Sequence, residues 1–279
     1  MDISQLFLQA ETNRRRLLEI IYNAGAGHTG GDLSCLNILT VLYFDTLKNL
    51  SPENPKNPAR DRFILSKGHC VEALYTTLES RGFISKSTTD TLGKYGSILS
   101  GHPTIEVAGI EVNSGALGHG LSIGTGMAIA AKMDNAEYRT FVLMGDGEQG
   151  EGSIYEAAMS ASHYHLDNLT AIIDRNGLQI SGKTEDVMSL ENINERWTAF
   201  GWDVLQMDGD SIDEIVKTFN SIDYSNKKPH LIIAKTTKGK GVSYMENVAK
   251  WHHGVPTAEQ FEQGIKEISD RMGKILING

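Results

Sequence analysis

Cysteine and proline are scarce in this sequence of 279 residues, which contains two cysteines and six prolines. Cys35 and Cys70 have neither metal-ligand spacing nor a disulfide pattern, so we interpret both as small core residues. Three of the prolines fall in residues 51–61, "SPENPKNPARD", where they predict a loop because proline cannot continue a helix.

Clustered positive charge and long hydrophobic runs are also missing. A net charge of -9 argues against nucleic acid or an anionic membrane as the main partner. The longest basic run, Arg14 to Arg16, lies in a helical pattern, which predicts a solvated helix face. The N-terminus does not resemble a secretory signal, and no segment is apolar enough to span a bilayer, so we expect a cytoplasmic protein.

Apolar side chains recur at helical spacing in residues 4–23 and 33–47, and short apolar runs follow. These runs are "RFIL", "TFVLM", "LTAIID", "WDVLQM" and "HLIIAKT". Their alternation with helical segments predicts an α/β fold with a parallel sheet and helices on both faces. We expect one domain over residues 1–279, with a helical part at about 1–60, an α/β core at about 61–245 and a helical tail at about 256–279.

The loops that follow the predicted strands are candidate ligand sites, because ligands of parallel sheets lie at the carboxyl ends of strands. One of them, "GDGEQG", fits the dinucleotide pattern through Gly145, Gly147 and Gly150, and the next strand ends at Asp174. An NAD-linked enzyme is therefore one interpretation. However, Asp146 would repel a phosphate by about 4 kcal/mol at about 4 Å with an effective dielectric constant near 20.

A divalent cation would turn this repulsion into attraction. Asn176, in the loop after the next strand, offers an amide oxygen, and the Leu178 carbonyl offers another. Because these ligands are all oxygen atoms, they favour Mg²⁺, with Ca²⁺ as a substitute, bound together with a diphosphate.

Gly-Asp-Gly followed by an asparagine at the end of the next strand resembles the metal–diphosphate motif of thiamine-diphosphate enzymes. Five ordered segments are similar to the N-terminal, diphosphate-binding domain of transketolases, over most of residues 10–255. They are "AGAGHTGG", "RFILSKGHCVEALY", "GHPTIEVAGIEVNSGALGHGLSIGTGMAIAAK", "GDGEQGEGSIYEAAMSASHYHLDNLTAIIDRNGLQISG" and "KTTKGKGV".

This resemblance implies roles for individual residues. The implied metal ligands are Asp146, Asn176 and the carbonyl of Leu178. The implied thiamine diphosphate contacts are His69, Gly115, Leu117, Gly145, Asp146, Gly147 and Asn176.

The implied catalytic residues are His28 and His102, which would face the donor ketose, a histidine from "WHHG", and Glu151, which would lie where two subunits meet. The "WHHG" segment leaves His252 and His253 as alternatives, and we take His253 as the candidate. Lys235 and Lys238 could balance the charge of the cofactor but stay outside this set. The role of His119 is open, and His230 is interpreted as structural.

The resemblance also implies a missing half, because transketolases carry the glutamate that activates the cofactor in a second, pyrimidine-binding domain. We expect a split enzyme in which a C-terminal transketolase subunit supplies that domain, as an α2β2 hetero-oligomer. The implied reaction transfers a two-carbon ketol unit from an anionic ketose to an aldose.

Two other functions remain alternatives. The chain could be the α subunit of a 2-oxo acid dehydrogenase, although His28, His69 and His102 argue against this. It could also be a non-catalytic regulatory subunit that retains the metal–diphosphate site. The sequence does not distinguish phosphate, sulfonate or branched sugars as substrates.

Overall fold

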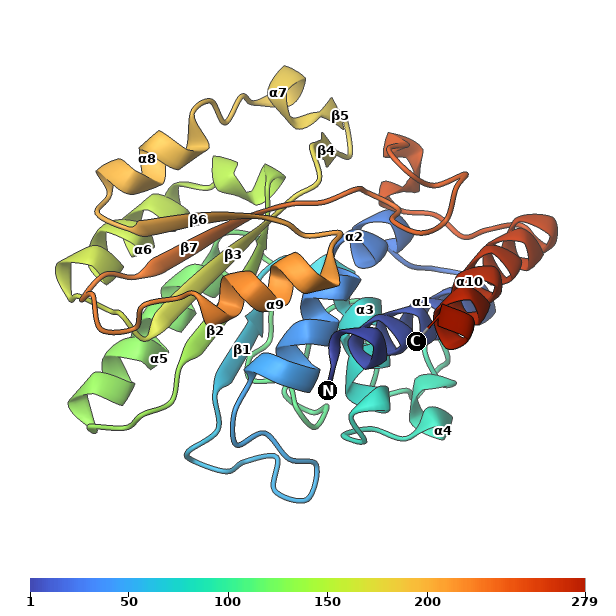
Figure 1. Cartoon of the computed structure of the whole chain (residues 1–279), viewed down its shortest axis with the longest axis horizontal. Helices are drawn as coiled ribbons and strands as arrows, with labels where there is room; N and C mark the ends of the chain where they lie inside the picture. Colours follow the sequence, from blue (N-terminus) through green and yellow to red (C-terminus); the bar gives the residue numbers. More distant parts are fainter. Residues whose placement is uncertain (279) are drawn as a thin grey trace.

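A five-stranded parallel sheet forms the centre of the computed structural model, which describes residues 1–278. Its strand order is β1-β2-β3-β7-β6, and every neighbouring pair is parallel, as the sequence predicted. The strands are β1 (Arg62–Leu65), β2 (Thr140–Gly145), β3 (Leu169–Arg175), β6 (Asp203–Asp208) and β7 (His230–Lys235). Their parallel direction brings the loops after β1, β2, β3 and β7 to one edge of the sheet (Figure 1).

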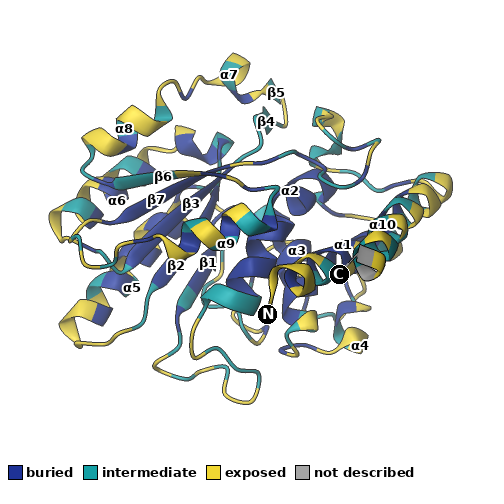
Figure 2. Cartoon of the chain, viewed as in Figure 1, coloured by how far each residue is buried: buried dark blue, intermediate teal, exposed yellow. Residues whose placement is uncertain are grey.

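Helices cover both faces of this sheet, because side chains along each strand alternate between two core clusters. Phe63 and Leu65 face one cluster, whereas Ile64 faces the other. The first cluster is formed with α1 (Ile3–Ala24), α2 (Thr29–Val41), α3 (Val71–Ser80), α9 (Ile212–Asn220) and α10 (Ala258–Asn278). The second is formed with α5 (His119–Met133), α6 (Gly152–His163) and α8 (Ile193–Ala199). Figure 2 shows that burial concentrates on β2, β3 and β7 and on α2 and α3, whereas the edge strand β6 is mostly intermediate or exposed.

The remaining elements are short. They are η1 (Leu42–Thr46), η2 (Gly68–Cys70), α4 (Lys86–Thr89), η3 (Gly147–Gly150), β4 (Leu178–Gln179), β5 (Gly182–Lys183), α7 (Thr184–Val187) and η4 (Ala249–His252). The predicted helical tail at about 256–279 corresponds to α10. The last residue of the predicted tail, Gly279, lies outside the described residues.

The prediction that Arg14 to Arg16 form a solvated face is wrong for two of the three residues. Arg14 and Arg16 are buried, and only the side chain of Arg15 is half-exposed. Arg14 pairs with Glu11, and Arg16 lies 2.9 Å from Glu79. The reason is tertiary: α2, α3 and α10 all pack against α1, so most of its circumference is covered.

Both cysteines are fully buried, as expected for small core residues. Within residues 1–278, no helix has the length and apolar character that crossing a membrane requires.

Candidate active site

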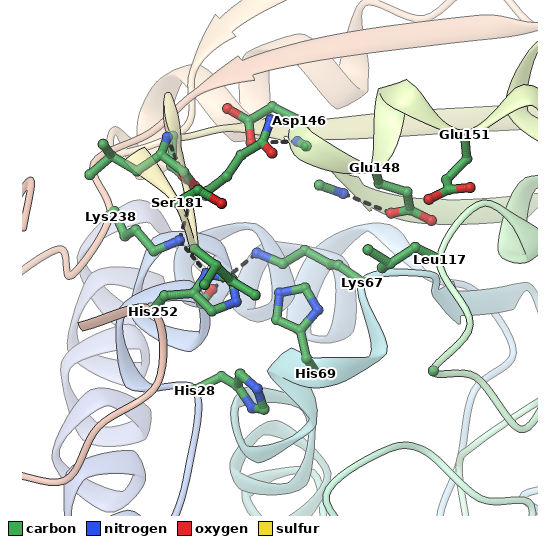
Figure 3. A pocket seen from close by; sticks show the side chains of 18 of the residues that line it. His28, Lys67, His69, Leu117, Asp146, Glu148, Glu151, Ser181, Lys238 and His252 are labelled. Carbon is green, nitrogen blue, oxygen red and sulfur yellow. Dashed lines mark hydrogen bonds between the residues drawn. The ribbon is translucent and has the colours of Figure 1, made fainter. Parts of the chain in front are cut away.

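A cavity of about 410 Å³ opens at the carboxyl edge of the sheet. It is lined by residues from the loops after β1, β2, β3 and β7, together with the start of α2 and the segment before α5 (Figure 3). Of the predicted site residues, only His253 is not among the lining residues. The predicted residues that line the cavity are His28, His69, His102, Gly115, Leu117, Gly145, Asp146, Gly147, Glu151, Asn176 and Leu178.

Asp146 is the acidic residue of the "GDGEQG" loop, and it is almost completely buried. Its Oδ1 accepts a hydrogen bond from the backbone N–H of Gly147 at 2.7 Å. Its Oδ2 accepts from the N–H of Gly177 at 2.7 Å, from the hydroxyl of Thr184 at 3.0 Å and from Arg175 at 3.1 Å. The carboxylate is therefore held in one orientation, and Oδ1 has the fewer partners.

Asn176 and Leu178 place two further oxygens in the same cavity. The side-chain oxygen of Asn176 accepts from the N–H of Leu178 at 3.1 Å, and the Leu178 carbonyl accepts from the ammonium of Lys238 at 3.0 Å. A lysine ammonium thus already contacts one of the three predicted metal ligands.

The donor chemistry of this set fits Mg²⁺, which prefers oxygen ligands and shares them with phosphates. Within the described residues, no group of three or more His, Cys, Asp or Glu side chains could hold a metal ion. This agrees with a set that contains one carboxylate, one amide and one backbone carbonyl. At Gly147, a Cβ atom would lie 2.9 Å from the side chain of Gln179, which would have to move to make room for it.

Imidazole rings gather on the other side of the cavity. The ring centre of His28 lies 5.3 Å from that of His69, 6.5 Å from that of His102 and 4.8 Å from that of His253. Burial, together with the neighbouring imidazoles, lowers the pKa of His28 to about 4. The Nδ1 atom of His28 is buried and has no hydrogen-bond partner within residues 1–278. His28 is therefore a neutral base near pH 7 with one ring nitrogen available to a ligand.

The two alternatives in "WHHG" occupy different positions. His252 is half-buried and lines the cavity, and its Nδ1 lies 3.0 Å from the Lys238 ammonium. Burial and the charge of Lys238 lower the pKa of His252 to about 3. His253 is exposed and does not line the cavity, but its ring packs against His28. The structure thus places one histidine toward the lysine and the other beside the outer face of His28.

The segment before α5 passes along the cavity through Gly115 and Leu117. Gly115 has φ +152, a backbone conformation that side chains rarely adopt, and a Cβ atom there would lie 3.1 Å from the ring of His102. Glu151 lines the cavity and is exposed, whereas His119 is exposed outside it.

Two lysines that were not among the predicted site residues, Lys67 and Lys238, line the base of the cavity. Lys67 is buried and forms an ion pair with Asp174, which is fully buried and also accepts from Ser34 at 2.6 Å. This pairing argues against the NAD interpretation, because the Asp174 carboxylate is not available to a ribose. Lys238 is buried in the cavity, whereas Lys235 is exposed. Periodicity along one strand does not distinguish such lysines, although Lys67 and Lys238 lie in two of the segments that carry the resemblance, "RFILSKGHCVEALY" and "KTTKGKGV".

Comparison with known proteins identifies the family. Residues 8–274 match the family described as "Transketolase, thiamine diphosphate binding domain". The chain is 70% identical over 275 residues to an apulose-4-phosphate transketolase subunit of Phocaeicola vulgatus, covering 99% of this chain and 98% of that protein. It is 40% identical over 271 residues to a 6-deoxy-6-sulfo-D-fructose transketolase subunit of a Clostridium species, covering 96% of this chain and 98% of that protein.

The fold agrees with this assignment. A crystal structure of transketolase from Campylobacter jejuni superposes with a TM-score of 0.85 and 30% sequence identity. The match covers 99% of this chain but only 48% of that protein, so this chain spans about half of a full-length transketolase. The sequence-based prediction of a split-enzyme half is confirmed. The chain belongs to the transketolase family, as an N-terminal subunit with the thiamine-diphosphate-binding domain.

Proposed function

We propose that this chain binds Mg²⁺ and the diphosphate end of thiamine diphosphate, and that it works with a C-terminal transketolase subunit to transfer a two-carbon ketol unit. The observation that carries the proposal is the convergence of Asp146, Asn176 and the Leu178 carbonyl in one cavity with the histidines. Asp146 follows β2, Asn176 and Leu178 follow β3, and the histidines come from other segments, and a shared ligand gives a reason for their convergence.

The oxygen ligands would hold the metal ion from the side of β2 and β3. Because Oδ1 of Asp146 has only the Gly147 N–H as a partner, it is the carboxylate oxygen best placed to take a cation. The N–H of Gly147 and the ammonium of Lys238 would then be free to donate to diphosphate oxygens. Lys238 is suited to this role because burial lowers the pKa of its ammonium group, and a bound anion would raise that pKa again.

When bound, thiamine diphosphate supplies the nucleophilic carbon that ketol transfer requires. The histidines of the chain would orient the ketose and exchange protons with its hydroxyl groups. His28 is suited to accept a proton because it is neutral and its Nδ1 lacks a partner among the described residues. His102 and His253 are exposed beside it and would bind the sugar from the open side.

A partner subunit would close this open side. Glu151 is exposed at the rim of the cavity, where the partner's pyrimidine-binding domain would meet it. Ile180, 75% exposed, lines the same rim and would become buried by the partner. The names of the relatives describe them as subunits, which supports the need for a partner. We propose that the assembly is α2β2.

The proposed donor is apulose 4-phosphate, because the relative with 70% identity is named for it. A sulfonated ketose is the next candidate, from the relative with 40% identity. Contacts from the partner subunit would select the anionic group.

The test is an assay of the chain together with a C-terminal transketolase subunit, with ketose phosphates and ketose sulfonates as donors and an aldose phosphate as acceptor. The proposal predicts turnover only when both chains, thiamine diphosphate and Mg²⁺ are present. If the partner alone transfers the ketol unit and this chain only changes its rate, the chain is a regulator and the proposal is wrong.

A further inference from the structure

Glu148 is a second acidic side chain of the "GDGEQG" loop, and the function proposed above does not use it. It lines the cavity, two residues from Asp146, yet it is only 2% exposed. Its Oε1 accepts from the N–H of Gly118 at 2.9 Å and from the hydroxyl of Ser66. Its Oε2 accepts from the N–H of Gly145 at 2.9 Å. Both oxygens are therefore occupied by donors of this chain.

The three donors belong to three different walls of the cavity. Ser66 directly follows β1, Gly118 precedes α5, and Gly145 ends β2. These segments carry the His69 loop, the Leu117 segment and the Asp146 loop, respectively. Figure 3 shows the Glu148 side chain between Asp146 and Leu117. No backbone hydrogen bond within the described residues joins the Gly118 segment to the other two.

Close packing makes this junction specific. A Cβ atom at Gly118 would lie 2.6 Å from Glu151, and a Cβ atom at Gly120 would lie 2.3 Å from the hydroxyl oxygen of Ser66. The N–H of Gly120 also donates to Ser66 at 3.2 Å. The start of α5 thus approaches the loop after β1 closely enough for a carboxylate to bridge them.

We propose that Glu148 is a positioning residue that joins these three walls into a cradle formed before the cofactor binds. This inference rests on the proposed function for the identity of the ligand. A buried carboxylate that accepts from two backbone N–H groups and a hydroxyl forms charge-assisted hydrogen bonds, which are stronger than neutral ones. Without it, the Gly118 segment would keep only contacts such as that of Gly120 with Ser66 and that of the Ser114 hydroxyl with the Leu65 carbonyl, at 2.7 Å. More of its ordering would then fall on the binding step, which weakens binding.

Glu148→Gln is the most informative variant because it keeps the size of the side chain. An amide has one oxygen and one NH₂ group, so whichever way it turns, the NH₂ group faces the N–H of Gly118 or of Gly145. Ser66→Ala removes the hydroxyl that donates to Glu148 and that accepts from the N–H of Gly120, and it leaves both backbone contacts of Glu148 in place. Glu137→Gln, on an exposed glutamate, is the matched control.

The first measurement is amide hydrogen exchange of the full chain without cofactor. We expect the segments around Gly118 and Gly145 to exchange about tenfold faster or more in Glu148→Gln, and at the wild-type rate at Gly145 in Ser66→Ala. The second is the dissociation constant of thiamine diphosphate with Mg²⁺ for the two-subunit complex, which should rise about tenfold or more in Glu148→Gln. Glu137→Gln should change neither quantity.

Unchanged exchange at both glycines, or unchanged cofactor affinity in a variant that exchanges faster, would overturn the inference. A purely structural role would lower the unfolding temperature and leave the dissociation constant unchanged below it. Glu148→Asp keeps the charge but shortens the side chain, so it repeats the test should the amide variant not fold. If wild-type complex fails to bind thiamine diphosphate, the proposed function is wrong, whereas the exchange result still decides whether Glu148 joins the walls.

Discussion

Two parts of the cavity differ in how completely the chain satisfies their polar groups. The floor, which we define as Lys67, Glu148 and Asp174, is buried, and its charged groups have partners within the chain. The mouth, which we define as His28, His102, Glu151 and Ile180 in the lining together with His253 packed against His28, is partly or fully exposed, and Nδ1 of His28 lacks a partner within the described residues. The chain thus satisfies the polar groups at the base of the site by itself, and under the proposed function a ligand and a second subunit would cover the mouth.

Removing the ammonium of the floor should have the largest effect. Lys67→Met leaves the fully buried Asp174 without its counter-ion, which typically costs about 3–5 kcal/mol. Urea denaturation of the full chain measures the free energy of unfolding. Lys235→Met, at an exposed lysine that ends β7, is the control and should change it by less than about 0.5 kcal/mol. A loss of less than about 1 kcal/mol for Lys67→Met would mean that the floor is not held by this ion pair.

A substitution of Asp146, which belongs to neither the floor nor the mouth, should mainly weaken cofactor binding. Asp146→Asn keeps the shape but removes the charge that attracts the metal ion. Loss of groups that merely support metal ligands costs about 10–100-fold in affinity, so loss of a ligand should cost about 100-fold or more. The dissociation constant of thiamine diphosphate at fixed Mg²⁺ checks this, with the exposed Asp134→Asn as control. Equal affinities for wild type and Asp146→Asn would remove Asp146 from the metal site.

Variants of the two neighbouring histidines should affect different ligands: one the cofactor, the other the sugar. His252→Gln disturbs the contact with Lys238 and should weaken cofactor binding by about tenfold. His253→Gln, beside the outer face of His28, should lower kcat/KM for the ketose by about tenfold and leave cofactor affinity unchanged. Measuring both constants for both variants tests the assignment, and the reverse pattern would exchange the two roles.

The smallest effect concerns acid stability. An unfolded histidine titrates near pH 6.5, whereas burial lowers the pKa of folded His28 to about 4. Between these values the unfolded chain binds more protons, so stability should fall as the pH is lowered from about 6.5 to about 4. His28→Gln cannot take up this proton and should lose less of its unfolding temperature over the same range. His163→Gln, at an exposed histidine, should follow the wild type, and an identical curve for His28→Gln would contradict the shift.

The sequence predicted the sheet well because its strands are short apolar runs buried on both faces. It also predicted which loops surround the site, since parallel strands bring their carboxyl ends together. It failed at Arg14 and Arg16 because their surroundings come from distant segments. Arg14, for example, donates to the carbonyl of Lys240 at 3.1 Å, and this contact depends on how α1 packs rather than on local pattern.

Within the site, the sequence predicted that Asp146, Asn176, Leu178, His28, His69 and His102 would lie together, and all of them line one cavity, whereas their roles stay predictions. Lys67 and Glu148 were not predicted, because their roles depend on tertiary contacts with Asp174 and Gly118 that local sequence does not encode. The sequence could not distinguish His252 from His253, because the two are adjacent and their side chains point in different directions. In the structure only His252 contacts Lys238.

The most direct test of the account is calorimetric titration of thiamine diphosphate into the complex of this chain with its C-terminal subunit, with Mg²⁺ and again with the metal chelated. The account predicts binding that depends on the metal ion and weakens strongly without it. Equal dissociation constants in the two titrations would show that Asp146, Asn176 and the Leu178 carbonyl hold no bridging cation, and the central claim would be wrong.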